Sequence, residues 1–92
     1  MKLDTFADFL LKHPSIKFEL HGHTESDKAD YSVYKKSLNI KLSNLRINQV
    51  YQYLVQKSVK GSRIIQNAYG GTKPISSIEE KNRRIEVKII SL

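Results

Sequence analysis

The chain has no cysteine, no tryptophan and no long hydrophobic run, since its longest uninterrupted apolar stretches, such as residues 9–11, have three residues. The lack of cysteine excludes disulfide frameworks, thiolate metal sites, iron–sulfur clusters and cysteine nucleophiles. A membrane-spanning helix needs about 20 consecutive apolar residues, so the sequence predicts none. The chemistry of any function therefore has to come from oxygen and nitrogen side chains.

Acidic residues are scarce relative to basic ones. Nine Asp and Glu against 16 Lys and Arg give a formal net charge of +7 on 92 residues. An excess of this size favours an anionic partner, which can be a nucleic acid, an anionic lipid or a carboxylate-bearing polymer. The hydrophobic share of 39% and the charged share of 27% are typical of a folded chain. The length allows a single domain over residues 1–92.

Hydrophobic periodicity predicts two helices and three strands. In chain order they are a helix at residues 3–12, a strand at 16–21, a helix at 38–57, and strands at 63–69 and 84–89. Pro14 ends the first helix because it disfavours helical geometry at the preceding residue, and Gly22 is expected to end the first strand. The polar stretch from His23 to about Lys36 is predicted to be an exposed loop.

The order of these elements predicts an α/β (α+β) two-layer sandwich, with helices covering one face of a small sheet. Because no crossover helix fits between Gly70 and Asn82, the last two strands are expected to be antiparallel neighbours. The leading helix has no strand before it, which leaves a layered α/β unit incomplete at its start.

Few clusters of residues indicate chemistry on their own. His21 and His23 are two positions apart and so can share one face of a strand, but a zinc site needs three or four ligands and His13 is the one histidine left to add. Residues 70–74 (GGTKP) lack the spacing of a P-loop. No Ser-His-Asp arrangement and no carboxylate pair in apolar surroundings stands out. The sequence therefore predicts no catalytic residue, no metal site and no cofactor.

Basic residues gather around the long helix and near the last strand. They are Lys35, Lys36, Lys41 and Arg46, followed by Arg83 and Arg84. Nucleic-acid-binding sheets place stacking aromatic rings beside such charge, whereas the predicted strands here offer Phe18 and Tyr69, both expected in the core. A solvated basic surface explains most of the lysines, so no nucleic-acid partner is predicted and this function stays a minor alternative.

Four segments, in this order, resemble the OmpA-like peptidoglycan-binding domain. Residues 16–25 (IKFELHGHTE) resemble the family's strand followed by Gly-His-Thr-Asp, and residues 39–46 (NIKLSNLR) resemble Asn-x-x-Leu-Ser-x-x-Arg. Residues 68–75 (AYGGTKPI) resemble Gly-Tyr-Gly-Glu-x-x-Pro-Ile, and residues 81–87 (KNRRIEV) resemble Asn-Arg-Arg-Val-Glu. The order and spacing of these segments across nearly the whole chain make chance an unsatisfactory explanation.

The chain also departs from the family pattern. The family's opening strand is absent, so the resemblance implies a β-α-β-α-β-β arrangement that lacks its first strand, and a domain truncated at its N-terminus. Glu25 stands where the family has Asp, Ile47 replaces the common alanine, and the stretch from Glu25 to Asn39 is longer than usual. The remaining elements are implied to form a mixed sheet with its helices packed on one face.

The resemblance implies that the domain binds peptidoglycan, without catalysis, through the diaminopimelate of the peptide stem. The implied ligand-binding residues are Thr24, Glu25, Asn39, Leu42, Arg46 and Arg83. A carboxylate at the Glu25 position would meet the ligand's ammonium, and Arg46 would bind its carboxylate with a planar bidentate fork that lysine lacks. From spacing alone, Asn39, Leu42 and Arg46 lie on one helix face.

Further residues of the four segments are expected to shape the structure, and they are Gly22, His23, Tyr69, Gly70, Asn82 and Arg84. Four assignments have alternatives. Arg46 can instead be an ordinary surface arginine of the helix, and Arg83 can do structural work together with Asn82 and Arg84. Asn39 can instead be a helix cap, and Asp27 or Asp30 can supply the carboxylate in place of Glu25.

The family resemblance also implies a location and a role in the cell. The expected location is the periplasm of a Gram-negative bacterium, where the domain, associated with the outer membrane or the cell wall, would anchor that membrane or an envelope complex to peptidoglycan. One alternative keeps the fold but makes the chain a protein-interaction module of an envelope assembly with a degenerate peptidoglycan site, as Glu25 and the altered loop suggest. The other is the basic nucleic-acid-binding domain, which rests on charge alone.

Overall fold

The computed structural model describes residues 3–26 and 33–91. Its elements, in order, are α1 (Leu3–Lys12), β1 (Lys17–His23), α2 (Val33–Gln56), the short 3-10 helix η2 (Gly61–Arg63), β2 (Ile64–Gly70), α3 (Glu79–Asn82) and β3 (Arg84–Ser91). The predicted first helix is confirmed, and each predicted strand has an observed counterpart. In the described part of the chain, none of the helices is long and apolar enough to cross a membrane.

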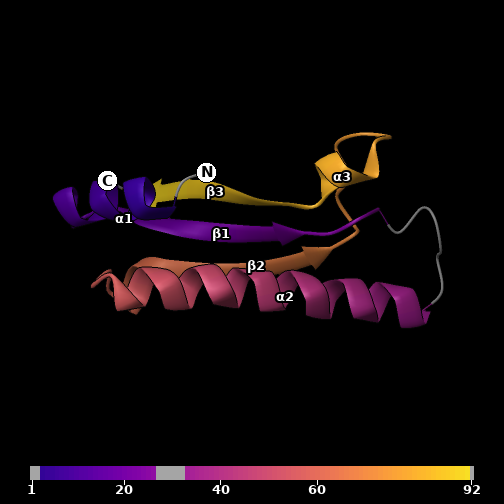
Figure 1. Cartoon of the computed structure of the whole chain (residues 1–92), viewed down its shortest axis with the longest axis horizontal. Coiled ribbons are helices and arrows are strands. Elements are labelled where there is room, and N and C mark those ends of the chain that lie inside the picture. Colours follow the sequence, from indigo (N-terminus) through magenta and orange to yellow (C-terminus); the bar gives the residue numbers. More distant parts are fainter. Residues whose placement is uncertain (1–2, 27–32, 92) are drawn as a thin grey trace.

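The three strands form a mixed sheet with β1 in the middle, in the order β2-β1-β3 (Figure 1). β1 is parallel to β2 and antiparallel to β3. The expectation that the last two strands are neighbours was wrong, because β2 and β3 lie on opposite sides of β1. The connection between them passes the carboxyl end of β1 and contains α3, a single turn that the sequence analysis had assigned to a loop.

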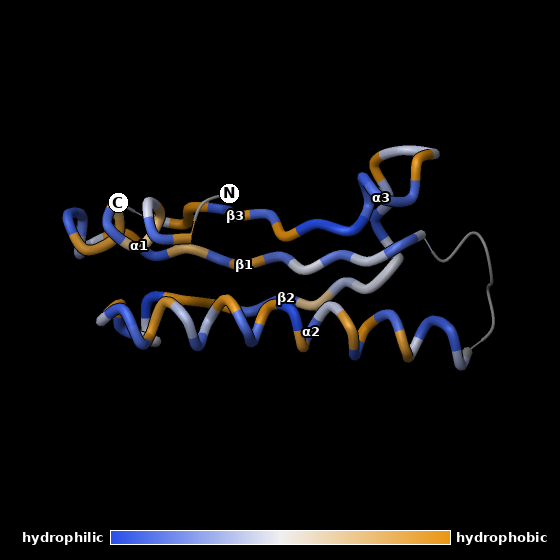
Figure 2. The backbone as a smooth tube through the Cα atoms, viewed as in Figure 1, coloured by the Kyte–Doolittle hydropathy of each residue, from blue (hydrophilic) through white to orange (hydrophobic). Residues whose placement is uncertain are grey.

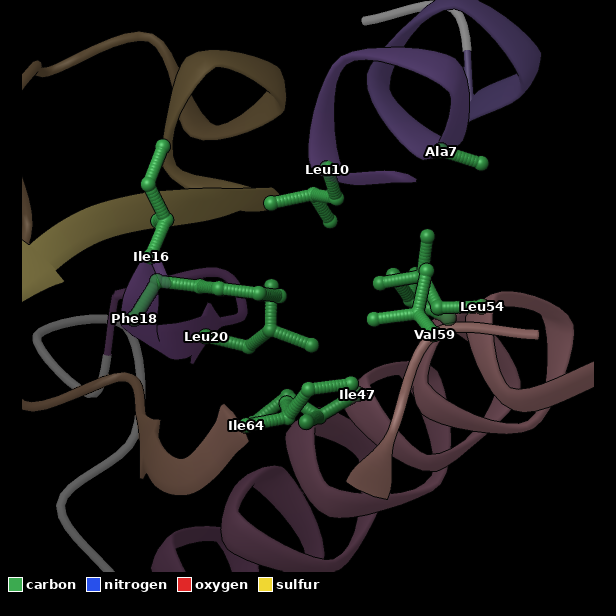
Figure 3. Close-up of a cluster of buried hydrophobic side chains, with 10 residues drawn as sticks. Ala7, Leu10, Ile16, Phe18, Leu20, Ile47, Leu54, Val59 and Ile64 are labelled. Carbon is green, nitrogen blue, oxygen red and sulfur yellow. The ribbon is translucent and has the colours of Figure 1, made fainter. Parts of the chain in front are cut away.

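The hydrophobic core lies between the sheet and the two long helices. Phe18 and Leu20 of β1 are fully buried, and Leu10 of α1 and Leu54 of α2 pack into the same cluster (Figure 3). The ring of Phe6 meets that of Phe18 edge to face, with 5.4 Å between centroids. Both helices therefore cover the same face of the sheet, as the order of elements predicted.

β1 extends beyond the residue that was expected to end it. Gly22 pairs with both neighbouring strands, and the strand continues to His23, with an irregularity in its register to β2 between these two residues. A Cβ atom at Gly22 would lie 2.6 Å from the Ile47 side chain and 2.8 Å from the Ser43 carbonyl oxygen. Gly22 thus marks close packing of the strand on α2 and not a turn.

α2 begins at Val33, five positions before the predicted start at residue 38, so the last part of the predicted loop is helical. Its first turns have little apolar character, and Tyr34 is 77% exposed, so no buried stripe marks them in the sequence. Figure 2 shows polar and apolar segments alternating along α2. Asn39 lies within the helix, which excludes the alternative that it caps the N-terminus. Asp27 and Asp30 lie outside the described residues.

A buried arginine holds the end of α1 against the sheet. Arg63 is 8% exposed, and its guanidinium donates hydrogen bonds to the carbonyl oxygens of Leu10 at 3.0 Å, His13 at 2.8 Å and Ile16 at 2.9 Å. Arginine is rarely buried without such partners. The carbonyls of Leu10 and His13 also accept from the amides of His13 and Ile16, so Arg63 reinforces the turn that leads from α1 into β1.

Candidate functional site

A small pocket of about 130 Å³ opens at the carboxyl end of β1. All six predicted ligand-binding residues line it, together with one that was not predicted: Thr24, Glu25, Asn39, Leu42, Arg46, Arg83 and Lys35. They come from the residues that follow β1, from α2 and from the residue before β3. Three of the four segments that resemble the family, far apart in sequence, therefore meet at this pocket.

The α2 wall of the pocket follows from helical spacing. Asn39, Leu42 and Arg46 are separated by three and four residues, so one face of the helix carries all three. Asn39 is buried and its Nδ2 donates to the backbone oxygen of Glu25 at 3.4 Å. Arg46 is half-buried and, among the residues that the structure describes, makes no hydrogen bond or ion pair. The pocket thus contains a guanidinium whose five donors are available to a ligand.

The β1 wall is fixed by backbone contacts. The Thr24 amide donates to the carbonyl of Gly70 at 2.9 Å, and the Thr24 hydroxyl donates to the carbonyl of Glu25 at 3.0 Å. The Glu25 side chain is partly exposed and forms an ion pair with Arg83. Among the described residues that line the pocket, Lys35, Arg46 and Arg83 are cationic and Glu25 is the one carboxylate. Arg46, which has no partner among the described residues, favours an anionic group on a ligand.

Asn82 organises the segment that delivers Arg83 to the pocket. Its side chain is fully buried, with 0% exposure, accepts from the amides of Ile75 and Ser76, and donates to the Ser76 carbonyl and to Glu79 Oε1. The same Glu79 oxygen accepts from the amide of Ser26 at 3.1 Å. The turn before β3 is in this way tied to the chain that follows β1.

Gly70, the last residue of β2, contacts both α2 and Thr24, which lines the pocket. Its φ is +59°, a left-handed conformation that glycine adopts without a steric cost. Its amide donates to the Ser43 hydroxyl at 3.1 Å, and a Cβ atom here would lie 2.9 Å from the backbone nitrogen of Ile40. The motif glycine is needed for both the turn and the close approach to α2.

His23 and Tyr69 pack together on the face of the sheet opposite the core. Tyr69 was expected in the core, but it is half-buried and lies outside it. Side chains alternate along a strand, so Tyr69 points to the same face of the sheet as His21 and His23. Its ring stacks on His23 with 5.3 Å between centroids and meets His21 edge to face at 5.1 Å. The Nζ of Lys73 lies 4.1 Å from the centroid of the Tyr69 ring.

The imidazole of His23 is 2% exposed and neither ring nitrogen has a hydrogen-bond partner among the described residues, although Nε2 lies 3.4 Å from Oε1 of Glu86. Burial, reinforced by the charge of Arg84, lowers the pKa of His23. Arg84 also donates to Glu86 at 2.6 Å, which lowers the pKa of that carboxyl. Arg84 is further held by the carbonyls of Lys73 and Asn82.

The two histidines do not form part of a larger ligand set. Over residues 3–26 and 33–91, no group of three or more His, Asp or Glu side chains is placed to hold a metal ion. Their contacts are with Tyr69 and with the carboxylates of Glu19 and Glu86.

Lys35 was not predicted to belong to the site, because the stretch from His23 to about Lys36 was expected to be a loop. Lys35 is four positions before Asn39 and seven before Leu42, so it extends the same helix face by one turn. Knowing where α2 begins would have been sufficient to predict its place in the pocket wall.

Comparison with known proteins gives a consistent set of matches. The model of the OmpA family matches residues 1–88. Outer membrane porin F of Pseudomonas fluorescens is 34% identical over 88 residues, which are 90% of this chain and 25% of the porin. The peptidoglycan-associated lipoprotein of Buchnera aphidicola is 31% identical over 81 residues, which are 87% of this chain and 43% of the lipoprotein. The chain thus spans less than half the length of these relatives.

The fold also matches solved structures. The C-terminal domain of Helicobacter pylori MotB superposes with a TM-score of 0.78 at 24% identity, over 97% of this chain and 69% of that domain's chain. At this identity the likeness concerns the fold, and it agrees with a mixed sheet whose helices cover one face.

Proposed function

The chain belongs to the OmpA family, and from this premise we propose that it binds peptidoglycan, without catalysis, through the diaminopimelate of the stem peptide. The observation that carries the proposal is the half-buried Arg46, which has no partner among the described residues and faces a pocket that also contains Thr24 and Glu25. The relatives named above are a porin and a lipoprotein, which supports a role without catalysis.

The chemistry of the pocket suits the end of a diaminopimelate side chain. This end is an amino acid and carries one carboxylate and one ammonium at a fixed separation. Arg46 offers the carboxylate two parallel hydrogen bonds, which are stronger and more directional than a single contact from a lysine. Glu25 and the backbone oxygens near it accept from the ammonium, and Leu42 contacts the methylene chain between the two ends.

Arg83 has to share Glu25 with the incoming ammonium. The pair is partly exposed, and exposed ion pairs contribute about 0–1 kcal/mol, so rearranging it costs little. Once Arg83 leaves Glu25, its guanidinium is available as a second donor to the carboxylate of the ligand. Arg83 therefore acts as a ligand contact that is paired internally before binding.

In the cell we propose that this binding anchors the outer membrane or an envelope complex to the cell wall from the periplasm. The relatives, an outer membrane porin and a peptidoglycan-associated lipoprotein, support this location. The net charge of +7 supports a carboxylate-rich polymer as the partner.

Titration of the labelled protein with a diaminopimelate-containing muropeptide, followed by NMR chemical shifts, tests the proposal. Arg46→Ala should weaken binding by about 10- to 150-fold, the equivalent of a lost charge-assisted hydrogen bond. Arg46→Lys should recover part of this loss, because it keeps the charge but not the fork. Lys41→Ala removes an exposed cation from α2 outside the pocket and serves as the control. Equal affinity of the wild type and Arg46→Ala would refute the mechanism.

The internal ion pair between Glu25 and Arg83 favours a second candidate, a protein-interaction module with a degenerate peptidoglycan site. In that case the pair is permanent and the pocket stays closed to the ammonium. The absence of shifts at Thr24 and Arg46 with millimolar muropeptide would support this candidate over peptidoglycan binding.

A further inference from the structure

The strand β3 lies at an edge of the sheet. Among the described residues it pairs with β1 alone, so the amides and carbonyls along its other side have no strand beside them. Such an edge is a template for pairing with another chain. The pairing of β3 with β1 is regular except for one irregularity near the C-terminal end of β3, opposite Lys17 and Phe18. The stretch from Arg84 to Ile89 is therefore a regular free edge.

The apolar side chains of β3 are only partly covered. In β1, Phe18 and Leu20 are fully buried, whereas none of the residues of β3 is buried. Ile85 and Val87 are half-buried against the core, and Ile89, which alternation places on the same face, is 48% exposed. Apolar surface thus remains exposed beside the free edge of this strand.

The charged side chains of β3 match those of a second copy of the same strand. On the face away from the helices they are Arg84, Glu86 and Lys88. In an antiparallel register that places Val87 opposite Val87 of the second copy, Glu86 lies opposite Lys88 and Lys88 lies opposite Glu86. Opposite charges at such positions stabilise a strand pair. On the helix side the same register brings Ile85 of each copy against Ile89 of the other.

The neighbouring registers are less favourable. A slide of two residues in one direction places Glu86 opposite Glu86, and a slide in the other direction places Lys88 opposite Lys88. Like charges directly opposite each other are destabilising. A slide of one residue turns the apolar side chains of one copy toward the charged face of the other. The second edge strand, β2, has no charged residue, so its pairing with itself offers no charge complementarity.

We propose that the chain forms a symmetric homodimer in which two β3 strands pair antiparallel about Val87. Both copies contribute the same edge, so the contact is closed and does not extend into a fibre. The two-fold axis is perpendicular to the sheet, so the helices of both copies lie on one side of the joined sheet. Arg83, which lines the pocket, directly precedes β3, so the two pockets lie toward opposite ends of the paired strands. The inference is independent of what the pocket binds.

Sedimentation equilibrium over a concentration series up to the millimolar range tests the dimer, because a small interface binds weakly. The proteins are the wild type, Lys88→Glu, Glu86→Lys and the variant with both changes. Lys41→Glu, at an exposed position on α2, makes the same charge change away from β3 and is the control. Urea unfolding checks the fold of each variant, since Lys88 lies opposite Glu19 and Glu86 accepts from Arg84 within one copy.

The wild type should reach twice the monomer mass as its concentration rises. Lys88→Glu and Glu86→Lys should each raise the dimer dissociation constant by about tenfold, because each turns both attractive charge pairs of the symmetric contact into like-charge pairs. The variant with both changes should return to within about twofold of the wild type, because its charge pairs are restored with their signs exchanged. Lys41→Glu should dissociate as the wild type does.

A second measurement needs no variant. Ile85 and Ile89 are four positions apart on one strand, which separates them by about 13 Å within a copy. A nuclear Overhauser effect between their methyl groups, measured in a mixture of isotope-labelled and unlabelled protein, is therefore expected only in the dimer.

A monomeric mass at every concentration would overturn the dimer and leave the edge of β3 to a different strand. Equal dissociation constants for Lys88→Glu and Lys41→Glu, or a dimer without the contact between Ile85 and Ile89, would refute the proposal as well. If the charge variants fail to fold, the contact between Ile85 and Ile89 in the wild type decides. None of these outcomes changes the expected binding of muropeptide, so this proposal and the proposed function can fail separately.

Discussion

Two arginines at opposite ends of the parallel strands β1 and β2 differ in how their guanidinium groups are used. Arg63, at the start of β2, donates to three carbonyl oxygens and is almost fully buried. Arg46, beside the end of β1, is half-buried and has no partner among the described residues. A saturated guanidinium stabilises the fold, whereas an unpaired one at the wall of a pocket is available for binding.

The same contrast extends to the surroundings of each arginine. Around Arg63 the chain turns closely from α1 into β1 and its carbonyls are satisfied internally. Around Arg46 the end of β1, the turn before β3 and α2 meet without filling the space between them, and the pocket remains. Whether an arginine stabilises the fold or is available for binding therefore depends on the end of the sheet at which it lies.

The largest expected effect comes from the matched pair Arg63→Met and Arg46→Met. Arg63→Met should lower the free energy of unfolding by about 3–4 kcal/mol, because it removes the three hydrogen bonds that the buried guanidinium donates to the carbonyls of Leu10, His13 and Ile16. Arg46→Met should change it by less than about 0.5 kcal/mol, while abolishing most muropeptide binding. Urea unfolding and the titration described above measure the two quantities. Equal free energies of unfolding for the two variants would contradict the different roles assigned to Arg63 and Arg46.

Asn82→Ala tests whether the binding end has structural residues of its own. The Asn82 side chain is fully buried and makes four hydrogen bonds, so their loss should cost about 2–3 kcal/mol. Asn44→Ala, an exposed position on α2, should cost less than about 0.5 kcal/mol. If thermal or urea unfolding gave equal values for both, the role of Asn82 in holding the turn before β3 would be wrong.

Gly70→Ala should have a smaller effect of about 1–2 kcal/mol, the cost of a side chain in the left-handed region. The close approach of Ile40 adds to it. Gly71→Ala, at a position whose φ is not positive, should cost less. A fall in muropeptide affinity in parallel with the stability of Gly70→Ala is expected, because the Gly70 carbonyl accepts from the amide of Thr24.

Local sequence patterns were sufficient for much of this architecture. The end of α1 at Lys12 follows from Pro14, and alternation identified the buried positions of β1. The spacing of Asn39, Leu42 and Arg46 placed them on one helix face, and the pocket contains all three. Each of these features depends on residues that are near one another in the sequence.

The features that were missed depend on contacts between distant segments. Gly22 was expected to end β1, but its lack of a side chain serves packing on α2. The order β2-β1-β3 depends on the path of the connection after Gly70. Hydrophobic periodicity in the sequence gives no information about that path. Arg63 has the sequence context of a surface cation, and its burial depends on carbonyls of residues 10–16. The start of α2 has no buried stripe to mark it.

The smallest expected effect is a change in how protein stability depends on pH. It tests whether His23, like Arg46, is a polar side chain without a hydrogen-bond partner at the binding end of the sheet. Burial, with the charges of Arg84 and His21, lowers the pKa of His23 in the folded protein, and Glu86 opposes this only in part. As the pH falls below about 6.5, the unfolded chain therefore takes up a proton before the folded protein does. The stability contributed by neutral His23 is fully present above this pH and declines below it.

His23→Phe keeps an aromatic ring against Tyr69 but cannot titrate, so the urea midpoint of this variant should fall less between pH 7 and pH 5 than that of the wild type. His13→Gln, at an exposed position before β1, should leave the wild-type slope unchanged. The slope is compared, and not the stability at one pH, because the larger phenyl ring can alter packing by itself. If the urea midpoint changed with pH equally in His23→Phe and the wild type, Glu86 would stabilise the protonated His23 enough to offset its burial. His23 would then not resemble Arg46 as a polar group without a partner.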